Sequence, residues 1–356
     1  MLHVRQAKPG EEKKVADLAV QIFKPNMREQ FVRLFHVNNI QHIFVAADDE
    51  DIVSALNYYQ TGMLTSHGQM NVASIGAVCT KDEYRKQGLS SKLLGLAEDS
   101  MLKENIDFVI ISGRRGLYQR FGARDVGAMF YYNLNQSNDS KKVNLRLFDG
   151  HYEVLYHEYN QEDIRYIRAY DEFQDLFLSQ TFPDSYQTYH TYVIYEDDLP
   201  KAYVIVIDHK DKMSLEVKEM AGSRSHIASA FSALMNLHKK TSVEIYVPYS
   251  DKLNHELKEL GEQTTQHATL KIISKSSFFE KLNHDFVNKQ KKITLKNEND
   301  ITILEIGTNR YQLNHDETHQ LIFSGKIPKR IDQKHHQTIQ SVFPIVLPWS
   351  HNLNYQ

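Results

Sequence analysis

The hydrophobic positions of roughly the first 130 residues alternate between the period of two typical of strands and the period of about 3.6 typical of helices. Val15, Leu18 and Ile22, for example, fall on one face of a helix. The pattern predicts, in chain order, a strand at 2–6, a helix around 15–23, a hairpin with arms 43–47 and 52–59, a strand at 70–78, a helix at 92–102 and a strand at 107–111. This order indicates a mixed α/β domain and not a strict βαβ repeat.

The same order of elements returns in weaker form between residues 192 and 262. The predicted elements there are a hairpin at 192–206 with an acidic turn, a strand at 214–220, a helix at 221–236 and a strand at 243–247. Two α/β segments can share such a rhythm by chance. We prefer a duplicated fold whose second copy keeps the core and has lost the functional site. Alignment of Gly122 with Gly261 places Leu257 opposite Tyr118, for instance.

Two polar stretches, 135–144 and 284–292, are rich in turn formers and suggest domain boundaries. After the second stretch, short strands are predicted at 293–295, 301–307 and 310–313, followed by a helix at 315–323. The expected domains are therefore 1–136, 145–283 and 293–356. The third is small and is expected to pack on the others instead of folding alone.

The composition limits the classes of function. A chain of 356 residues exceeds one ordinary core, and 42 Lys+Arg against 45 Asp+Glu give no overall charge that would favour nucleic acid or a membrane surface. Cys79 is the only cysteine, which excludes an internal disulfide. No signal peptide pattern and no apolar run long enough to cross a bilayer are present in the sequence. We expect a cytoplasmic protein without a nucleic-acid or membrane partner.

The loop 84-YRKQGLSS-91 lies between a predicted strand and a predicted helix. The first N–H groups of a helix lack partners inside the helix and attract anions such as phosphate. Gly88 allows the main chain to approach an anion closely, Arg85 and Lys86 add positive charge, and Ser90 or Ser91 can cap the helix or bind a phosphate oxygen. The alternative is an ordinary solvated turn with surface cations.

Residues 77–93 resemble motif A of the GNAT family of N-acetyltransferases, in which Arg or Gln is followed by two residues, Gly, any residue, and Gly or Ala. Arg85, Gly88 and Ser90 occupy these positions, and Ser90 departs from the usual Gly or Ala. Residues 117-LYQRFGA-123 resemble the enhanced intracellular survival branch of that family, where a tyrosine precedes Arg-Phe-Gly. In this chain that tyrosine is Tyr118, and Ala123 replaces a frequent aromatic residue.

The resemblance implies tandem GNAT folds with mixed central sheets, a degenerate second copy and a sterol-carrier-like C-terminal module. It also implies acetyl-coenzyme A as the donor. The pantetheine arm would pair with the strand before the loop, and the loop would hold the pyrophosphate. The implied coenzyme A residues are Val78, Cys79, Thr80, Arg85, Lys86, Gln87, Gly88, Leu89, Ser90 and Ser91.

For catalysis, the resemblance implies direct transfer of the acetyl group to a neutral amine. Tyr118 would protonate the departing thiolate, and the C-terminal carboxylate of Gln356 would act as the base. Tyr118 could instead be a packing residue, the C-terminus could be frayed, and Glu83 is a second carboxylate near the loop. Direct transfer needs no cysteine nucleophile, so Cys79 is expected to be a small buried residue.

Two classes of function remain open. The first is an N-acetyltransferase acting on a small amine, a lysine or an N-terminus. The second is a non-catalytic coenzyme A-binding scaffold or sensor. No metal is expected, because the adjacent His335 and His336 point in different directions and no H-E-x-x-H spacing occurs. The resembling branch tends to form rings or trimers, so a homo-oligomer is compatible with the sequence.

Overall fold

The computed structural model describes residues 2–135 and 143–355, which form two compact units. The described residues of unit 1 are 2–127, 265–345 and 355, and those of unit 2 are 128–135, 143–264 and 346–354. The chain therefore leaves unit 1, builds unit 2, and returns. Most of the expected linker lies outside the described residues. The division into three domains at 1–136, 145–283 and 293–356 stays a prediction.

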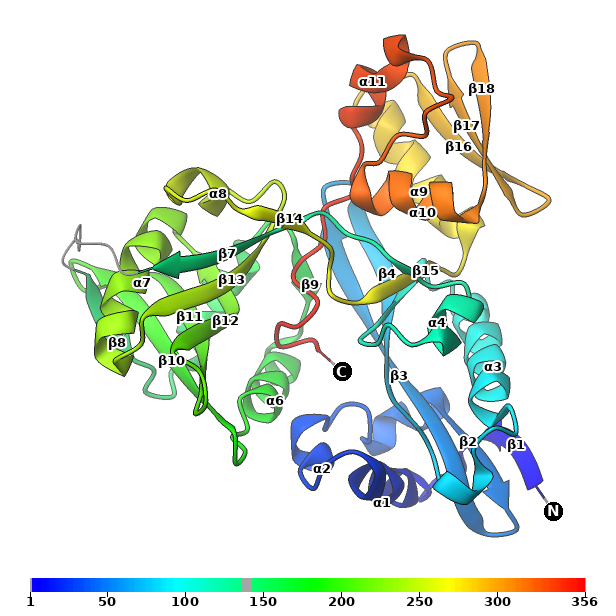
Figure 1. The fold of residues 1–356 in the computed structure, drawn as a ribbon, viewed down its shortest axis with the longest axis horizontal. Coiled ribbons are helices and arrows are strands. Elements are labelled where there is room, and N and C mark those ends of the chain that lie inside the picture. The colour runs from blue at the N-terminus through cyan, green and yellow to red at the C-terminus, as the bar shows by residue number, and fades with distance from the viewer. Residues whose placement is uncertain (1, 136–142, 356) are drawn as a thin grey trace. The chain divides into compact units, whose positions relative to one another are not determined.

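The first part of unit 1 follows the predicted order of elements closely (Figure 1). Its elements are β1 (Leu2–Gln6), α1 (Glu12–Ile22), α2 (Met27–Gln30), η1 (Val37–His42), β2 (Ile43–Asp48), β3 (Asp51–Thr65), β4 (Gly68–Thr80), η2 (Asp82–Tyr84), α3 (Leu89–Lys103), β5 (Phe108–Ile111), α4 (Gly116–Arg120), β6 (Arg124–Asp125) and β15 (Thr269–Ile272). The strands lie in the order β1-β2-β3-β4-β5-β15-β6. Only β4 and β5 are parallel neighbours, and α3 makes the crossover between them. The predicted mixed α/β fold is confirmed.

Alternating residues of the central strands point to opposite faces of this sheet, and helices pack against both faces. Ile43 and Val45 pack with Val15 and Leu18 of α1. Phe44, between them on β2, packs in the cluster on the opposite side, which contains Leu93 of α3. The sheet is therefore covered on both faces, and the site lies where its two central parallel strands separate.

A β-bulge interrupts the pairing of β4 with β3 near the end of β4. Ala55 pairs with Cys79 and Asn57 with Gly76, so β4 has one extra residue over this interval, and Ala77 adopts a φ of 51°. On the other side, β4 pairs with β5 only from Val72 to Ile75. The edge of β4 beyond Ile75 is therefore not paired with β5, and an extended ligand can bind to such an edge.

The later part of unit 1 contains a small three-stranded sheet and several helices. Its elements are α9 (Lys275–Asn288), β16 (Ile293–Glu298), β17 (Ile301–Ile306), β18 (Asn309–Leu313), α10 (His315–Ser324), η3 (Gln333–His335) and α11 (His336–Gln340). The predicted strands and helix of this region are confirmed. The polar stretch 284–292 is not wholly a linker, however, because α9 extends to Asn288 and buries Phe286 in that stretch. The likeness of this module to sterol carriers stays a prediction.

Unit 2 repeats the strand pattern of unit 1. Its elements are β7 (Met129–Asn135), β8 (Asn144–Leu147), α5 (Tyr152–Asn160), β9 (Arg165–Ile167), α6 (Tyr170–Gln180), β10 (Gln187–Glu196), β11 (Leu199–His209), β12 (Ser214–Gly222), α7 (Arg224–His238), β13 (Ser242–Pro248), α8 (Leu253–Glu256) and β14 (Glu262–Thr264). The main sheet has the order β14-β7-β13-β12-β11-β10-β8. As in unit 1, an antiparallel series leads to one parallel pair, β12 and β13, joined by a helix. The duplicated architecture inferred from the sequence is therefore visible in the two sheets.

One strand next to the edge of each sheet comes from an unexpected part of the chain. β7, which follows the first set of elements, pairs with β13 over its whole length. β15, which follows the second set, pairs with β5. The chain thus exchanges one strand between the two repeated folds. The return of the chain at residue 265, just before β15, makes unit 1 discontinuous, and the C-terminal segment 346–354 makes unit 2 discontinuous.

Candidate active site

The loop between β4 and α3 contains residues with a left-handed backbone and positively charged side chains. Residues 81–88 connect the two elements, and Gly88 caps α3 with a φ of 74° and a ψ of 11°. Lys86 also has a positive φ, 64°. These left-handed residues turn the chain so that α3, which begins at Leu89, starts next to the end of β4. The first N–H groups of α3 lie at this loop, as an anion site requires.

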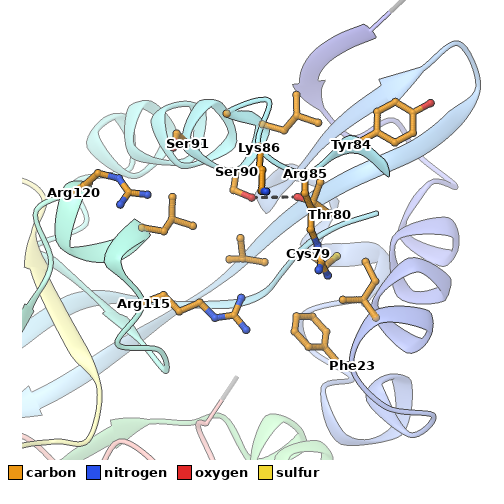
Figure 2. A pocket seen from close by; sticks show the side chains of 15 residues that line it. Phe23, Cys79, Thr80, Tyr84, Arg85, Lys86, Ser90, Ser91, Arg115 and Arg120 are labelled. Carbon is orange, nitrogen blue, oxygen red and sulfur yellow. Dashed lines mark hydrogen bonds between the residues drawn. The ribbon is translucent and has the colours of Figure 1, made fainter. Parts of the chain in front are cut away.

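A cavity of about 600 Å³, called here the donor cavity, lies at this loop (Figure 2). It is lined by Ile22, Phe23, Val78, Cys79, Thr80, Tyr84, Arg85, Lys86, Gly88, Leu89, Ser90, Ser91, Arg115, Leu117 and Arg120. All predicted coenzyme A residues line it except Gln87, whose side chain is exposed. Four cations in one cavity give it the charge that a pyrophosphate needs.

Ser90, the residue that departs from the motif, has a defined position. Its hydroxyl lies 3.2 Å from that of Thr80, which lies 2.7 Å from the hydroxyl of Ser54 (Figure 2 shows the first pair). Ser54 in turn donates a hydrogen bond of 2.8 Å to the carbonyl oxygen of Cys79. The serine thus ties the start of α3 to the end of β4 and keeps the loop closed on the strand.

Cys79 is buried, as predicted, with 3% of its surface exposed. Burial raises the pKa of its thiol to about 12, so the thiol stays protonated and unreactive at neutral pH. Glu83 is exposed, which agrees with the solvated residue that the sequence suggested as an alternative to a base.

Six residues of the donor cavity were missed in the sequence: Ile22, Phe23, Tyr84, Arg115, Leu117 and Arg120. Figure 2 shows Arg115 and Arg120 extending from the segment around α4, on the other side of the cavity from Arg85. Arg120 belongs to the motif at 117–123 and Tyr84 begins the loop 84-YRKQGLSS-91, so the sequence contained a signal for both. Phe23 and Arg115 lie outside these motifs and could not be found without the fold.

A second cavity of about 440 Å³, called here the acceptor cavity, shares Ile22, Phe23, Val78 and Arg115 with the donor cavity. It also contains the bulge residues Gly76 and Ala77, and Tyr118 lines it. A group attached to the end of a ligand in the donor cavity can therefore reach Tyr118 along β4. This is the arrangement expected for a donor thioester and an acid that protonates its leaving thiolate.

Tyr118 is held in a mostly apolar environment. Its side chain is 7% exposed and packs in the cluster that includes Ile75 and Leu93. Burial raises its pKa, the nearby Arg115 acts in the opposite direction, and Tyr355 adds to the rise. The phenol is therefore protonated at neutral pH, the state that a general acid requires.

Gly113 leaves the space that the ring of Tyr118 occupies. A Cβ atom at residue 113 would lie 2.6 Å from Cε2 of Tyr118. We therefore expect Gly113→Ala to displace the ring and lower turnover by about 10-fold or more while acetyl-coenzyme A still binds, since small misplacements of catalytic groups cost this much. Gly95→Ala on α3 is the control, because nothing lies within 4 Å of a Cβ there. Equal turnover of the two variants would show that the position of Tyr118 is unimportant.

Gln356, the predicted base, lies outside the described residues. Its neighbour Tyr355 lines the acceptor cavity, and the rings of Tyr355 and Phe31 are 6.1 Å apart. The role of the C-terminal carboxylate stays a prediction.

Unit 2 lacks the loop that defines the donor cavity. Ser223 alone connects β12 to α7, whereas residues 81–88 connect the corresponding elements of unit 1. Arg224, the first residue of α7, is held by two carboxylates, Glu162 at 2.5 Å and Asp251 at 2.7 Å. A cation neutralised in this way is a poor partner for phosphate.

The diverging ends of β12 and β13 in unit 2 are occupied by the C-terminal segment 346–354. Trp349 stacks on Tyr246 of β13 with 4.2 Å between ring centroids. The main-chain N–H of Leu353 donates to Glu219 of β12 at 3.3 Å. The place that corresponds to the acceptor cavity is therefore filled by the chain itself, as expected for a degenerate copy.

Of the described His, Cys, Asp and Glu residues, one group of three lies close enough to share a metal ion: His190, Asp208 and His238, with ligand atoms within 4.8 Å of one another. Lys240 Nζ lies 2.7 Å from Asp208, and Tyr192 OH lies 2.9 Å from Nε2 of His238. These contacts account for the group as an ion-paired network, and the absence of a metal stays an expectation.

Within the described ranges, none of the helices combines the length and the apolar character needed to cross a membrane. Residues 3–125 match the family model of the acetyltransferase (GNAT) domain. This part of the chain therefore matches a GNAT domain, which supports an acyltransferase. A comparison with curated proteins gave no match.

Three solved structures share the fold over most of the chain. The GCN5-related N-acetyltransferase from Anabaena variabilis is 14% identical, with 96% of this chain and 97% of that chain covered and a TM-score of 0.67. A conserved protein of Enterococcus faecalis, described as a probable N-acyltransferase, is 12% identical (98% and 99% covered, TM-score 0.65). Eis1 from Mycobacterium abscessus is 12% identical (88% and 85% covered, TM-score 0.60). At these identities the likeness concerns the fold, which extends beyond the GNAT domain.

Proposed function

We propose that this protein is an N-acetyltransferase that moves an acetyl group from acetyl-coenzyme A directly to an amine. The observation that carries the proposal is the continuity of the donor cavity, with its cations and helix start, with an acceptor cavity lined by Tyr118. Acetyl as the acyl group, and a small molecule, a lysine or an N-terminus as the acceptor, belong to this proposal. So do the predicted cytoplasmic location and a homo-oligomeric state.

In the proposed binding mode, the pyrophosphate of acetyl-coenzyme A contacts the first N–H groups of α3, together with Arg85 and Lys86. Arg115 and Arg120 add charge from the other side of the cavity. The pantetheine amides pair with β4 at Val78 and Thr80, where β5 no longer occupies the edge. The thioester then lies near the bulge at Ala77.

The proposed reaction forms one bond and breaks one bond. The neutral amine attacks the thioester carbonyl carbon, an N–C bond forms, and the C–S bond breaks. The base, proposed to be the Gln356 carboxylate, takes the proton of the amine, and Tyr118 gives its proton to the thiolate. With ordinary pKa values of about 10 for tyrosine and 8.5 for a thiol, this last transfer is uphill by roughly 2 kcal/mol. Burial raises the pKa of Tyr118 and so increases this difference, while the positive charge of Arg115 acts in the opposite direction.

The test is an assay of free thiol released from acetyl-coenzyme A with a panel of amines, together with calorimetric binding of the coenzyme. Binding together with amine-dependent thiol release is the expected result. Tight binding without release for any amine would instead favour the second class, a coenzyme A-binding scaffold or sensor. The observation that supports this second class is the short connection between β12 and α7 in unit 2, where Ser223 alone takes the place of the loop.

A further inference from the structure

Ser54 is a buried polar residue whose place in the sheet could be filled by an apolar side chain. It lies near the start of β3, has 0% of its surface exposed and lines neither cavity. Its neighbours along the strand, Val53 and Ala55, are apolar core residues. A buried hydroxyl costs free energy unless its hydrogen-bonding capacity is used, so the partners of Ser54 indicate what it does.

The hydrogen bonds of Ser54 begin a chain of three hydroxyl groups that ends at the donor cavity. Ser54 lies opposite Thr80 in the register of β3 and β4, and their hydroxyl oxygens are 2.7 Å apart. Thr80 in turn contacts the hydroxyl of Ser90 at 3.2 Å, as Figure 2 shows. Thr80 and Ser90 line the donor cavity, so the chain connects the interior of the sheet to the wall of that cavity.

The direction of this hydroxyl chain follows from its first bond. Ser54 donates at 2.8 Å to the carbonyl oxygen of Cys79, which can only accept. Each hydroxyl has a single proton, and the proton of Ser54 is used in this bond. All bonds of the chain can therefore form only if Thr80 donates to Ser54 and Ser90 donates to Thr80. Ser90 then directs its proton at β4 and not at a ligand, so it acts on the donor cavity through its position.

The two ends of the loop before α3 are held in different ways. Tyr84 holds the first half of the loop, since its hydroxyl donates to Asp48 of β2 at 3.0 Å. At the other end, Gly88 has no side-chain cap and a left-handed backbone. The first N–H groups of α3 are therefore held against the sheet by the packing of Leu89 and by the hydroxyl chain.

We infer that Ser54 is a positioning residue of the donor cavity. Through Thr80 and Ser90, it fixes the first N–H groups of α3 in the arrangement that binds a pyrophosphate. This inference rests on the proposed use of acetyl-coenzyme A by the protein. N–H groups that are already in place bind an anion more tightly, because binding then costs less conformational entropy. Ser54 should therefore influence the affinity for acetyl-coenzyme A without contacting it.

Calorimetric affinities for acetyl-coenzyme A in a set of full-length variants test the inference. Ser54→Ala and Ser90→Ala should each weaken binding by about 5-fold, as the loss of one hydrogen bond commonly does. Because both act through one chain, the double variant should also lose about 5-fold, whereas independent effects would multiply to about 25-fold. Thr80→Val removes the middle hydroxyl and keeps the shape of the side chain. It should cause the same loss, and on that background Ser54→Ala should have no further effect.

Two further measurements separate positioning from a general loss of structure. Ser90→Thr keeps the hydroxyl and should retain the affinity of the natural protein. In steady-state kinetics, Ser54→Ala should raise the KM for acetyl-coenzyme A and leave kcat unchanged. Ser100→Ala is the matched control, since Ser100 also lies on α3, forms hydrogen bonds with Tyr58 and Glu104, and lines neither cavity. It should leave the affinity unchanged.

An unchanged affinity in Ser54→Ala would overturn the inference, and so would a loss of about 25-fold in the double variant. An equal loss in Ser100→Ala would also overturn it, because the affinity would then respond to any weakened hydrogen bond of α3. If the natural protein bound no acetyl-coenzyme A, the proposed function would fail together with the inference. Normal binding and acetylation in the natural protein, without the coupling of Ser54 to Ser90, would overturn the inference alone.

Discussion

Tyr118→Phe is expected to lower the turnover of amine acetylation by about 100- to 10,000-fold, the usual contribution of a general acid. The ring of Tyr118 is buried against Ile75 and Leu93, so phenylalanine keeps the packing and loses only the proton donor. The affinity for acetyl-coenzyme A should stay the same, since Tyr118 lines the acceptor cavity and is not among the residues of the donor cavity. Steady-state kinetics together with calorimetric binding measures both quantities.

Tyr186→Phe serves as the control for this prediction. Tyr186 is 76% exposed and belongs to unit 2, so loss of its hydroxyl should leave turnover unchanged. If Tyr118→Phe also turned over at the normal rate, Tyr118 would be a packing residue and the thiolate would take its proton from elsewhere. A loss of affinity for acetyl-coenzyme A in Tyr118→Phe would also contradict a role of Tyr118 as a proton donor alone.

Arg168→Met is expected to destabilise unit 2 by about 3–5 kcal/mol, since removal of one partner leaves a buried charge unpaired. Arg168 and Glu219 are almost completely buried and form two hydrogen bonds, of 3.0 and 2.7 Å. Arg168 also donates to Asn354 at 2.6 Å, so the pair connects β12 to the C-terminal segment. Urea unfolding followed by tryptophan fluorescence measures the effect, because Trp349, the only tryptophan, stacks on Tyr246 in the same unit.

The exposed ion pair of Arg146 and Asp198 gives the comparison. Arg146→Ala should change the free energy of unfolding by no more than about 0.5 kcal/mol, as is usual for surface pairs. The double variant Arg168→Met with Glu219→Leu should regain part of the lost stability, since neither charge then remains buried. If Arg168→Met were as stable as Arg146→Ala, the buried pair would not hold the C-terminal segment in place.

Much of the fold could be predicted because the hydrophobic periods of strands and helices can be recognised in short stretches of the sequence. Examples are the hairpin of β2 and β3, the order of strand, helix and strand around α3, and the weaker copy that contains α7. The exchange of β7 and β15 could not be predicted, because each is a short strand whose partner is decided by tertiary pairing. The extension of α9 to Asn288 was missed for a similar reason: Phe286 is the buried residue of a segment that is otherwise polar.

The donor cavity was more predictable than the acceptor cavity. Most of its lining residues lie between Val78 and Ser91, where a glycine, two cations and two serines occur together before a helix. The acceptor cavity is assembled from α1, α2, β4, the segment before α4 and Tyr355. Residues such as Lys24 and Phe31 line the cavity only because of this assembly, and no spacing in the sequence indicates it.

The central claim is that the loop between β4 and α3 binds the pyrophosphate of acetyl-coenzyme A. Calorimetric titration of Gly88→Val tests it most directly, with Gly68→Val as the control. Both glycines have a positive φ, 74° and 91°, and open space around a Cβ atom, but Gly68 lies at the opposite end of β4 from the loop. We expect heat of binding for the natural protein and for Gly68→Val. For Gly88→Val we expect a loss of affinity of about 10-fold or more, because its side chain strains the loop and blocks the approach of the anion. Absence of binding to the natural protein, or equal affinity of all three, would contradict it.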